Sequence, residues 1–291
     1  MRAHRRWKGS LAILALAWAC GGDRGEGAAD GAEPSAEPPS AEVRTAGDSL
    51  PAALLGTAPP PRGVAVNYYA ADPAATGYLV TPAGAGPHPA VILIHEWDGL
   101  NDRVRQVADA LADEGYVALA ADLYSGRTGS NREENMALVQ EVRSRPQAVI
   151  ANLNAALDFL RARDDVTGKV GTMGWCFGGG VALSYALGGE HHDATAMFYG
   201  SLVTDPDSLA ALDHEIYGTF AAEDDGIPPD QVEKFVAALR AAGVQNDIHV
   251  YDAVDHGFWL WVDQDFETRS GPALDAWTRL KAYLERTLRA G

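Results

Sequence analysis

Short β-rich runs alternate with segments of helical spacing from about residue 63 to the end of the chain. Alternation of this kind is typical of βαβ units, which build a mainly parallel sheet with helices on both faces. No internal repeat or second domain pattern is visible, so the sequence predicts one α/β domain. We expect strands at residues 64–69, 78–81, 90–95, 116–120, 215–220 and 247–251, and helices at residues 103–114, 132–143, 146–162, 179–187, 230–242 and 272–289.

The first 20 residues have the composition of a secretion signal. Basic residues precede an uncharged apolar run at residues 11–19, which ends at Cys20. That run is about half of the roughly 20 residues that a membrane-spanning helix needs. The residues before Cys20 also resemble a bacterial lipobox, which implies an exported, periplasmic-side protein whose only membrane contact is a lipid on Cys20. An ordinary signal peptide with an incidental cysteine is the alternative.

Residues 21–62 are dominated by Gly, Ala, Pro, Glu and Ser and show no apolar periodicity. This composition predicts a solvated tether, so we expect the folded domain at residues 63–291. The formal net charge of −17 excludes a nucleic-acid partner, because phosphate binding needs a basic stripe. Only Cys20 and Cys176 are available as thiols, and no disulfide framework is expected.

A glycine-flanked cysteine is the strongest local pattern in the chain. The segment 174–178 reads Gly-Trp-Cys-Phe-Gly, and it lies between a β-rich run and a series of small residues. A strand, a sharp turn and a helix would expose the Cys176 side chain above the sheet, as in a nucleophile elbow. The helix start at Phe177 would direct its backbone N–H toward a thiolate or an oxyanion. A buried structural cysteine is the alternative interpretation.

Two partners for such a nucleophile follow in the order acid, then histidine. Asp224 follows one predicted strand and His256 follows the next, and strand ends of this type gather at one edge of the sheet. We therefore expect a Cys176–Asp224–His256 triad. The rival acids are Glu223, Asp225 and Asp255.

The segment after the strand at residues 90–95 is the expected place for an oxyanion loop. We predict that the backbone N–H groups of Trp97 and Phe177 bind the oxyanion. Glu96 is expected to lie near the thiol and to control its protonation, although a solvated loop acid is the alternative. His95 is of interest only because Glu96 follows it.

Taken together, these segments resemble the dienelactone hydrolase family over residues 63–288. The resemblance implies an α/β-hydrolase domain without a large lid, and a Cys-Asp-His enzyme that cleaves a small ester or lactone. It also implies a glutamate that matches Glu96, no metal and no organic cofactor. The matching segments are 96–99, 121–124, 174–179, 198–200, Asp224 with Pro228, 256–258 and 276–277.

The sequence departs from the family pattern where arginines hold the carboxylate of a lactone. Arg127 is displaced by one position, and no arginine follows His256 within the segment 257–261. We therefore expect a less polar substrate. Candidate substrate-binding residues are Tyr124, Arg127, Tyr199 and Trp259. The alternative functions are a general carboxylesterase or thioesterase of the cell envelope, and a catalytically silent binding lipoprotein.

Overall fold

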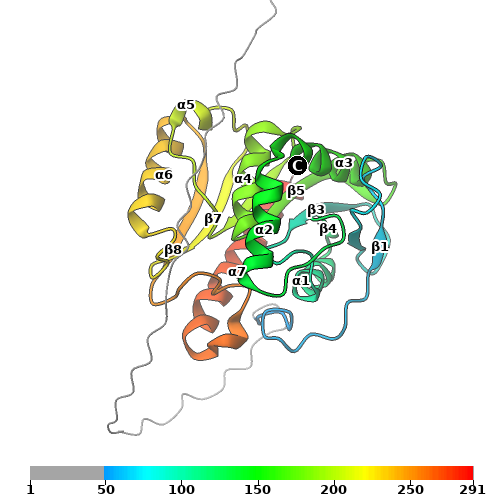
Figure 1. The fold of residues 1–291 in the computed structure, drawn as a ribbon, viewed down its shortest axis with the longest axis horizontal. Helices are drawn as coiled ribbons and strands as arrows, with labels where there is room; N and C mark the ends of the chain where they lie inside the picture. Colours follow the sequence, from blue (N-terminus) through cyan, green and yellow to red (C-terminus); the bar gives the residue numbers. More distant parts are fainter. Residues whose placement is uncertain (1–48, 291) are drawn as a thin grey trace, which may run out of the picture.

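One eight-stranded sheet runs through residues 49–290, the part of the chain that the computed structural model describes (Figure 1). The strand order is β1-β2-β4-β3-β5-β6-β7-β8. β2 pairs antiparallel with both β1 and β4, whereas the other neighbours are parallel. The strands are β1 (Val64–Val66), β2 (Gly77–Val80), β3 (His88–Ile94), β4 (Val117–Ala121), β5 (Val166–Trp175), β6 (Ala194–Phe198), β7 (Ile216–Ala221) and β8 (Asn246–Tyr251).

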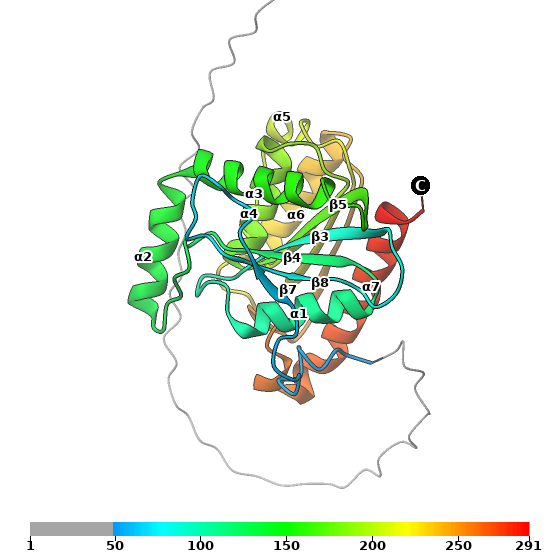
Figure 2. The ribbon, with the colours of Figure 1, turned by 90° about the vertical axis from the view of Figure 1, so that its right-hand side faces the viewer.

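Helices cover both faces of this sheet. Figure 2 shows α1 and α7 on one side and α3, α4 and α6 on the other. The predicted α/β architecture is therefore confirmed, and β4, β6 and β7 are buried along their whole length, as two covered faces require. The helices are α1 (Asp102–Asp113), α2 (Arg132–Arg143), α3 (Pro146–Arg161), α4 (Phe177–Gly188), α5 (Pro206–Leu209), α6 (Pro229–Ala241), the 3₁₀ helix η1 (Val262–Gln264) and α7 (Phe266–Leu288).

The last helix begins earlier than the sequence indicates. Proline favours the first turn of a helix, which is why the sequence suggests a start at Pro272. In the structure Asp265 caps α7 instead, because its side chain accepts a hydrogen bond from the Thr268 N–H (3.3 Å), and Pro272 lies inside the helix. The strand β6 has no counterpart among the predicted strands.

The boundary predicted between tether and domain is wrong. Residues 49–62, which we call the N-terminal arm, pack against α1 and α7 rather than extending into solvent (Figure 2). Ala53 is 2% exposed and Leu54 is fully buried in the core. Burial of these apolar side chains stabilises the arm on the domain. The predicted signal peptide (1–20), the lipidation site Cys20 and the remainder of the tether lie outside the described residues.

The turn between β5 and α4 has the geometry of a nucleophile elbow. Cys176 adopts a positive φ of 54°, and its N–H donates to the Phe198 carbonyl (3.0 Å). A Cβ added at Gly174 would overlap the Gly178 carbonyl, and one added at Gly178 would overlap the carbonyls of Ile94 and His95. Only glycine permits this backbone crossing, so the two glycines hold the elbow against the end of β3.

We expect Gly178→Ala to lower the free energy of unfolding by about 3 kcal/mol, because the added methyl must displace backbone. Gly188→Ala is the matched control in the same helix, since a Cβ there meets no atom within 4 Å. The control should change stability by less than about 1 kcal/mol. Urea unfolding of both variants measures the difference, and equal stabilities would contradict the proposed crossing constraint.

Candidate active site

Cys176, Asp224 and His256 lie together at the carboxyl ends of β5, β7 and β8. These strands are parallel, so residues that follow them meet at one edge of the sheet. The Nδ1 of His256 lies 2.6 Å from the Oδ2 of Asp224, and the same ring is within hydrogen-bonding reach of the Cys176 thiol. Residues far apart in the sequence thus place an acid, an imidazole and a thiol next to one another.

Asp224 is the acid that contacts the histidine, and its neighbours are not. Its side chain is 3% exposed, and Oδ1 accepts the N–H groups of Gly226 (2.8 Å) and Ile227 (3.1 Å). These bonds fix the carboxylate so that Oδ2 faces His256. The rival acids Glu223 and Asp225 are exposed, and Asp255 is paired with Arg269 (2.8 Å).

The thiol of Cys176 is buried, and the groups around it shift its pKa in opposite directions. Burial raises the pKa of the Cys176 thiol, because the thiolate loses hydration. Interactions with His256 and with the Phe177 N–H lower this pKa, whereas the negative charge of the Glu96 carboxyl raises it further. The resting side chain is therefore a protonated thiol beside groups that would stabilise the thiolate.

The pKa of His256 is governed by burial and by two neighbouring residues. Burial alone would lower this pKa, but the hydrogen bonds with Asp224 and Cys176 outweigh burial and raise the pKa well above its usual value. Bonding of Nδ1 to the carboxylate leaves Nε2 for the thiol. The arrangement makes the imidazole a stronger base than a free histidine.

Glu96 follows β3 and is buried, so the interpretation as a solvated loop acid is wrong. Its Oε2 accepts a hydrogen bond from the indole Nε1–H of Trp261 (2.8 Å). Burial raises the pKa of Glu96 to about 7, although the Trp261 hydrogen bond and the charges of His256 and Arg103 act in the opposite direction. Glu96 therefore changes ionisation near neutral pH. No local sequence pattern indicates that Trp261 is the partner of Glu96.

His95 has a structural role in the same loop. Its Nε2 accepts the Leu123 N–H (3.2 Å) and its Nδ1 donates to the Glu96 carbonyl (2.6 Å), which fixes one neutral tautomer. The ring thereby ties the end of β3 to the end of β4. Burial lowers the pKa of His95, in agreement with a neutral ring.

Three of the four predicted substrate-binding residues are fully buried, namely Tyr124, Tyr199 and Trp259. Tyr124 packs between His95 and Phe177, and its hydroxyl donates to the Trp97 carbonyl (3.0 Å). Trp259 stacks on Trp175 with ring centroids 5.7 Å apart. Tyr124 and Trp259 are therefore packing residues, and their assignment to substrate binding is corrected.

Tyr199 is buried but lies beside the triad. Its ring centroid is 4.9 Å from that of His256, and its backbone has a positive φ of 37°. The ring therefore supports the imidazole rather than facing open solvent. Trp97 is half-buried, and its N–H stays a predicted oxyanion donor, as does that of Phe177, which contacts the thiol.

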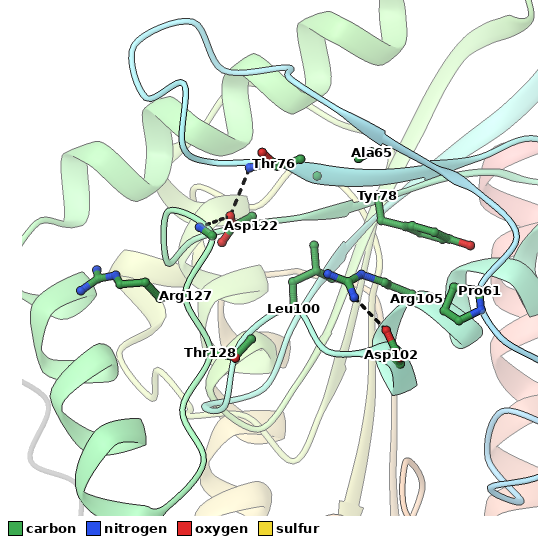
Figure 3. A pocket seen from close by; sticks show the side chains of 12 residues that line it. Pro61, Ala65, Thr76, Tyr78, Leu100, Asp102, Arg105, Asp122, Arg127 and Thr128 are labelled. Carbon is green, nitrogen blue, oxygen red and sulfur yellow. Dashed lines mark hydrogen bonds and ion pairs between the residues drawn. The ribbon is translucent and has the colours of Figure 1, made fainter.

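Arg127 lines a cavity of about 450 Å³ that also includes Leu100, Arg105 and Asp122 (Figure 3). The cavity lies next to the loops after β3 and β4, and none of the triad residues lines it. The guanidinium of Arg127 donates to the Tyr124 carbonyl (2.9 Å) and pairs with Glu141 (2.9 Å). Both partners of the Arg127 guanidinium are therefore groups of the protein itself.

Within residues 49–290, no group of His, Cys, Asp and Glu side chains is arranged to hold a metal ion. None of the helices in this part of the chain is both long and apolar enough to cross a membrane.

Known proteins resemble this chain over most of its folded part. Residues 75–288 match the dienelactone hydrolase family. A protein of Methylorubrum extorquens described as "Putative carboxymethylenebutenolidase" is 32% identical over 222 residues, which cover 72% of this chain and 76% of that protein. The "Putative Dienelactone Hydrolase" structure from Klebsiella pneumoniae has a TM-score of 0.64 at 29% identity and covers 73% of this chain and 93% of its own.

A dienelactone hydrolase structure from Anabaena variabilis shares the fold, with a TM-score of 0.56 at 23% identity, over 78% of this chain and 98% of that chain. The family match covers well over half of the chain, and the solved structures reproduce the mainly parallel sheet with helices on both faces. The chain thus belongs to the dienelactone hydrolase family, has the α/β-hydrolase fold without a large lid, and is a hydrolase that acts on ester or lactone bonds.

Proposed function

We propose that the protein cleaves its ester or lactone by covalent catalysis at Cys176, with His256 as base and Asp224 as the group that orients it. The observation that carries this proposal is the position of the His256 ring, which contacts the Asp224 carboxylate at 2.6 Å and acts on the pKa of the Cys176 thiol from its other side. Such an arrangement activates a nucleophile and fixes the imidazole tautomer.

The first half of the reaction forms an acyl-enzyme. His256 Nε2 takes the thiol proton while the sulfur attacks the carbonyl carbon, and the carbonyl electron pair moves onto oxygen. We assign binding of that oxyanion to the Phe177 and Trp97 N–H groups, and loss of one such donor costs about 10² to 10³ in rate. The C–O bond then breaks, and the leaving alkoxide takes the proton from His256.

The second half releases the acid. His256 takes a proton from water as the water oxygen attacks the thioester carbon, and the tetrahedral intermediate collapses with breakage of the C–S bond. The departing sulfur recovers the proton from His256. Throughout, Glu96 acts electrostatically: ionised, it raises the pKa of Cys176 and keeps the thiol protonated in the resting enzyme.

We expect Cys176→Ala to abolish turnover while the protein stays folded, because the sulfur is the attacking atom. Wild-type protein mixed with p-nitrophenyl acetate and quenched with acid should carry an acetyl group on the peptide that contains residue 176. Peptide mass spectrometry measures this adduct. Turnover in Cys176→Ala at the wild-type rate would refute the mechanism.

The adjacent acids supply a matched control for the same assay. Asp224→Asn should lower kcat by roughly 10³ to 10⁴, since the imidazole loses the acceptor that fixes its tautomer. Asp225→Asn removes an exposed carboxylate one residue away and should leave kcat within about twofold. Equal effects of the two changes would exclude the assigned triad acid.

We propose that the substrate is a less polar ester or lactone. The arginines nearest to Glu96 and His256 are engaged with the protein itself: Arg103 with Asp263 and Arg269 with Asp255. Arg127, the displaced arginine of the family pattern, is paired with Glu141. The segment 257–261 after His256 contains aromatic residues and no arginine, whereas the family pattern has a carboxylate-binding arginine after the histidine. A substrate carboxylate bound near Glu96 would therefore find these arginines of the described part of the chain already paired with acids.

For a pair of esters that differ only in one carboxylate, we expect kcat/KM to favour the uncharged ester by at least roughly tenfold, the equivalent of about 1.4 kcal/mol. The pair is compared at pH 8, where Glu96 is mostly ionised. A preference for the carboxylated ester would contradict the proposal. A thioester pair in the same panel separates a thioesterase from an esterase.

We also propose that the protein is exported and held on the periplasmic side of the cell envelope by a lipid on Cys20. The basic residues, the apolar run and the lipobox-like segment of residues 1–20 support this proposal. Expression with a labelled fatty acid should label the wild-type chain but not Cys20→Ser. Equal labelling of the two chains, or export without any label, would argue against the anchor.

A further inference from the structure

The hydrogen bond between Trp261 and Glu96 depends on how the indole is held. Trp261 is only half-buried and lies in the loop between β8 and α7, which also contains η1. Its own carbonyl accepts a hydrogen bond from Arg269 (2.7 Å), which fixes the backbone. Besides its N–H bond to Glu96, the ring is contacted by a side chain of another element.

Arg103 makes this contact from the first turn of α1. Its guanidinium lies 4.6 Å from the centroid of the Trp261 ring, close enough for a cation–π contact. The same guanidinium donates to the Asp263 carboxylate (2.7 Å) and to the Ala53 carbonyl. Its side chain is only 10% exposed, so it is held on several sides. Arg103 therefore joins the N-terminal arm to the loop that carries Trp261.

The N-terminal arm is itself fixed at this point. Leu54 is fully buried, and Gly56 adopts a positive φ of 66° at a place where a Cβ would overlap the Asp263 side chain. The arm backbone thus passes directly over Asp263, the second partner of Arg103. The arm, Arg103 and the loop therefore pack together, and this contact is connected to Glu96 through the Trp261 ring.

We propose that the N-terminal arm, acting through Arg103, holds Trp261 in place, so that Trp261 and Arg103 are positioning residues for Glu96. This inference rests on the proposed role of Glu96 beside the Cys176 thiol. The arm precedes residues 75–288, the part that matches the family, so the chain uses its own N-terminal segment to order a family site. The site therefore includes residues that the sequence assigned to a solvated tether.

The arm controls the ionisation of Glu96 through this contact. The Trp261 N–H stabilises the carboxylate, so a displaced indole raises the pKa of Glu96, which is about 7 with the indole in place. A protonated Glu96 no longer opposes ionisation of the thiol. The charged and titratable groups that face Glu96 are Asp98, Arg103, Cys176, Tyr199 and His256.

Alkylation of Cys176 by iodoacetamide reports this ionisation without any substrate. The rate is measured between pH 5.5 and 9.5 on the full-length chain by mass spectrometry of the peptide that contains residue 176, so Cys20 does not contribute. In the wild type we expect an inflection near pH 7, where Glu96 ionises. The inflection should be absent in Glu96→Gln, which assigns it.

Three variants test the chain of contacts. Trp261→Phe keeps the ring under Arg103 but removes the donor, and should move the inflection upward by roughly one pH unit. Leu54→Ala removes buried apolar contacts of the N-terminal arm. Arg103→Lys keeps the positive charge but loses the planar guanidinium that binds Asp263, Ala53 and the Trp261 ring. Both should move the inflection in the same direction by a smaller amount.

Leu239→Ala is the matched control for Leu54→Ala. It removes the same atoms from a fully buried leucine of α6, in the separate cluster on the far side of the sheet. Thermal unfolding verifies that both proteins are folded at the temperature of the assay, and the inflection should stay at its wild-type pH in Leu239→Ala. If Leu54→Ala does not fold, the shift of the inflection in Arg103→Lys decides whether the contact positions Glu96.

The proposal is overturned if the inflection is unmoved in Trp261→Phe, or if Leu54→Ala and Arg103→Lys both give the profile of Leu239→Ala. A wild-type profile identical to that of Glu96→Gln also overturns it. Alkylation does not depend on hydrolysis. Failure to form an acyl-enzyme would therefore refute the proposed mechanism and leave the alkylation result to be judged separately.

Discussion

The close passage of the β5–α4 turn over the end of β3 is the constraint on which the site depends. Gly178 lies so near the carbonyls of Ile94 and His95 that no side chain fits between them. This contact sets two things at once: Cys176 is forced into a positive φ above the sheet, and the loop that begins at His95 is placed beside it. The nucleophile and Glu96 are neighbours because two backbones touch.

Around this contact the buried side chains of Asp224, His95 and Glu96 are held by hydrogen bonds within the chain. Asp224 uses both of its oxygens, His95 uses both of its ring nitrogens, and Glu96 is bonded to Trp261. A buried polar group without a partner is costly, so each of these bonds also fixes a side-chain direction. The partner of Glu96 is a neutral donor. It stabilises the carboxylate less than a cation would, which leaves Glu96 able to change charge near neutral pH.

Aromatic residues near the site divide into two groups. Trp259 and Tyr124 fill the core and hold the strand ends in register, whereas Trp261 keeps part of its ring at the surface. The sequence pattern of this short loop does not tell a buried tryptophan from a half-buried one, because burial in a loop depends on which helix covers it. Here α7 packs over Trp259 through Trp277, and α1 reaches Trp261 through Arg103.

The sequence alone determined the alternating elements, the elbow and the order of Cys176, Asp224 and His256. These are properties of local spacing, and apolar periodicity and glycine pairs encode them directly. Only the tertiary structure decided that Asp224 rather than Asp225 meets His256, since the choice depends on which carboxylate the Gly226 and Ile227 amides bind. Tertiary packing likewise turned the last part of a polar-looking tether into an ordered arm. A few buried side chains such as Leu54 suffice for that, and local composition does not reveal the surface that receives them.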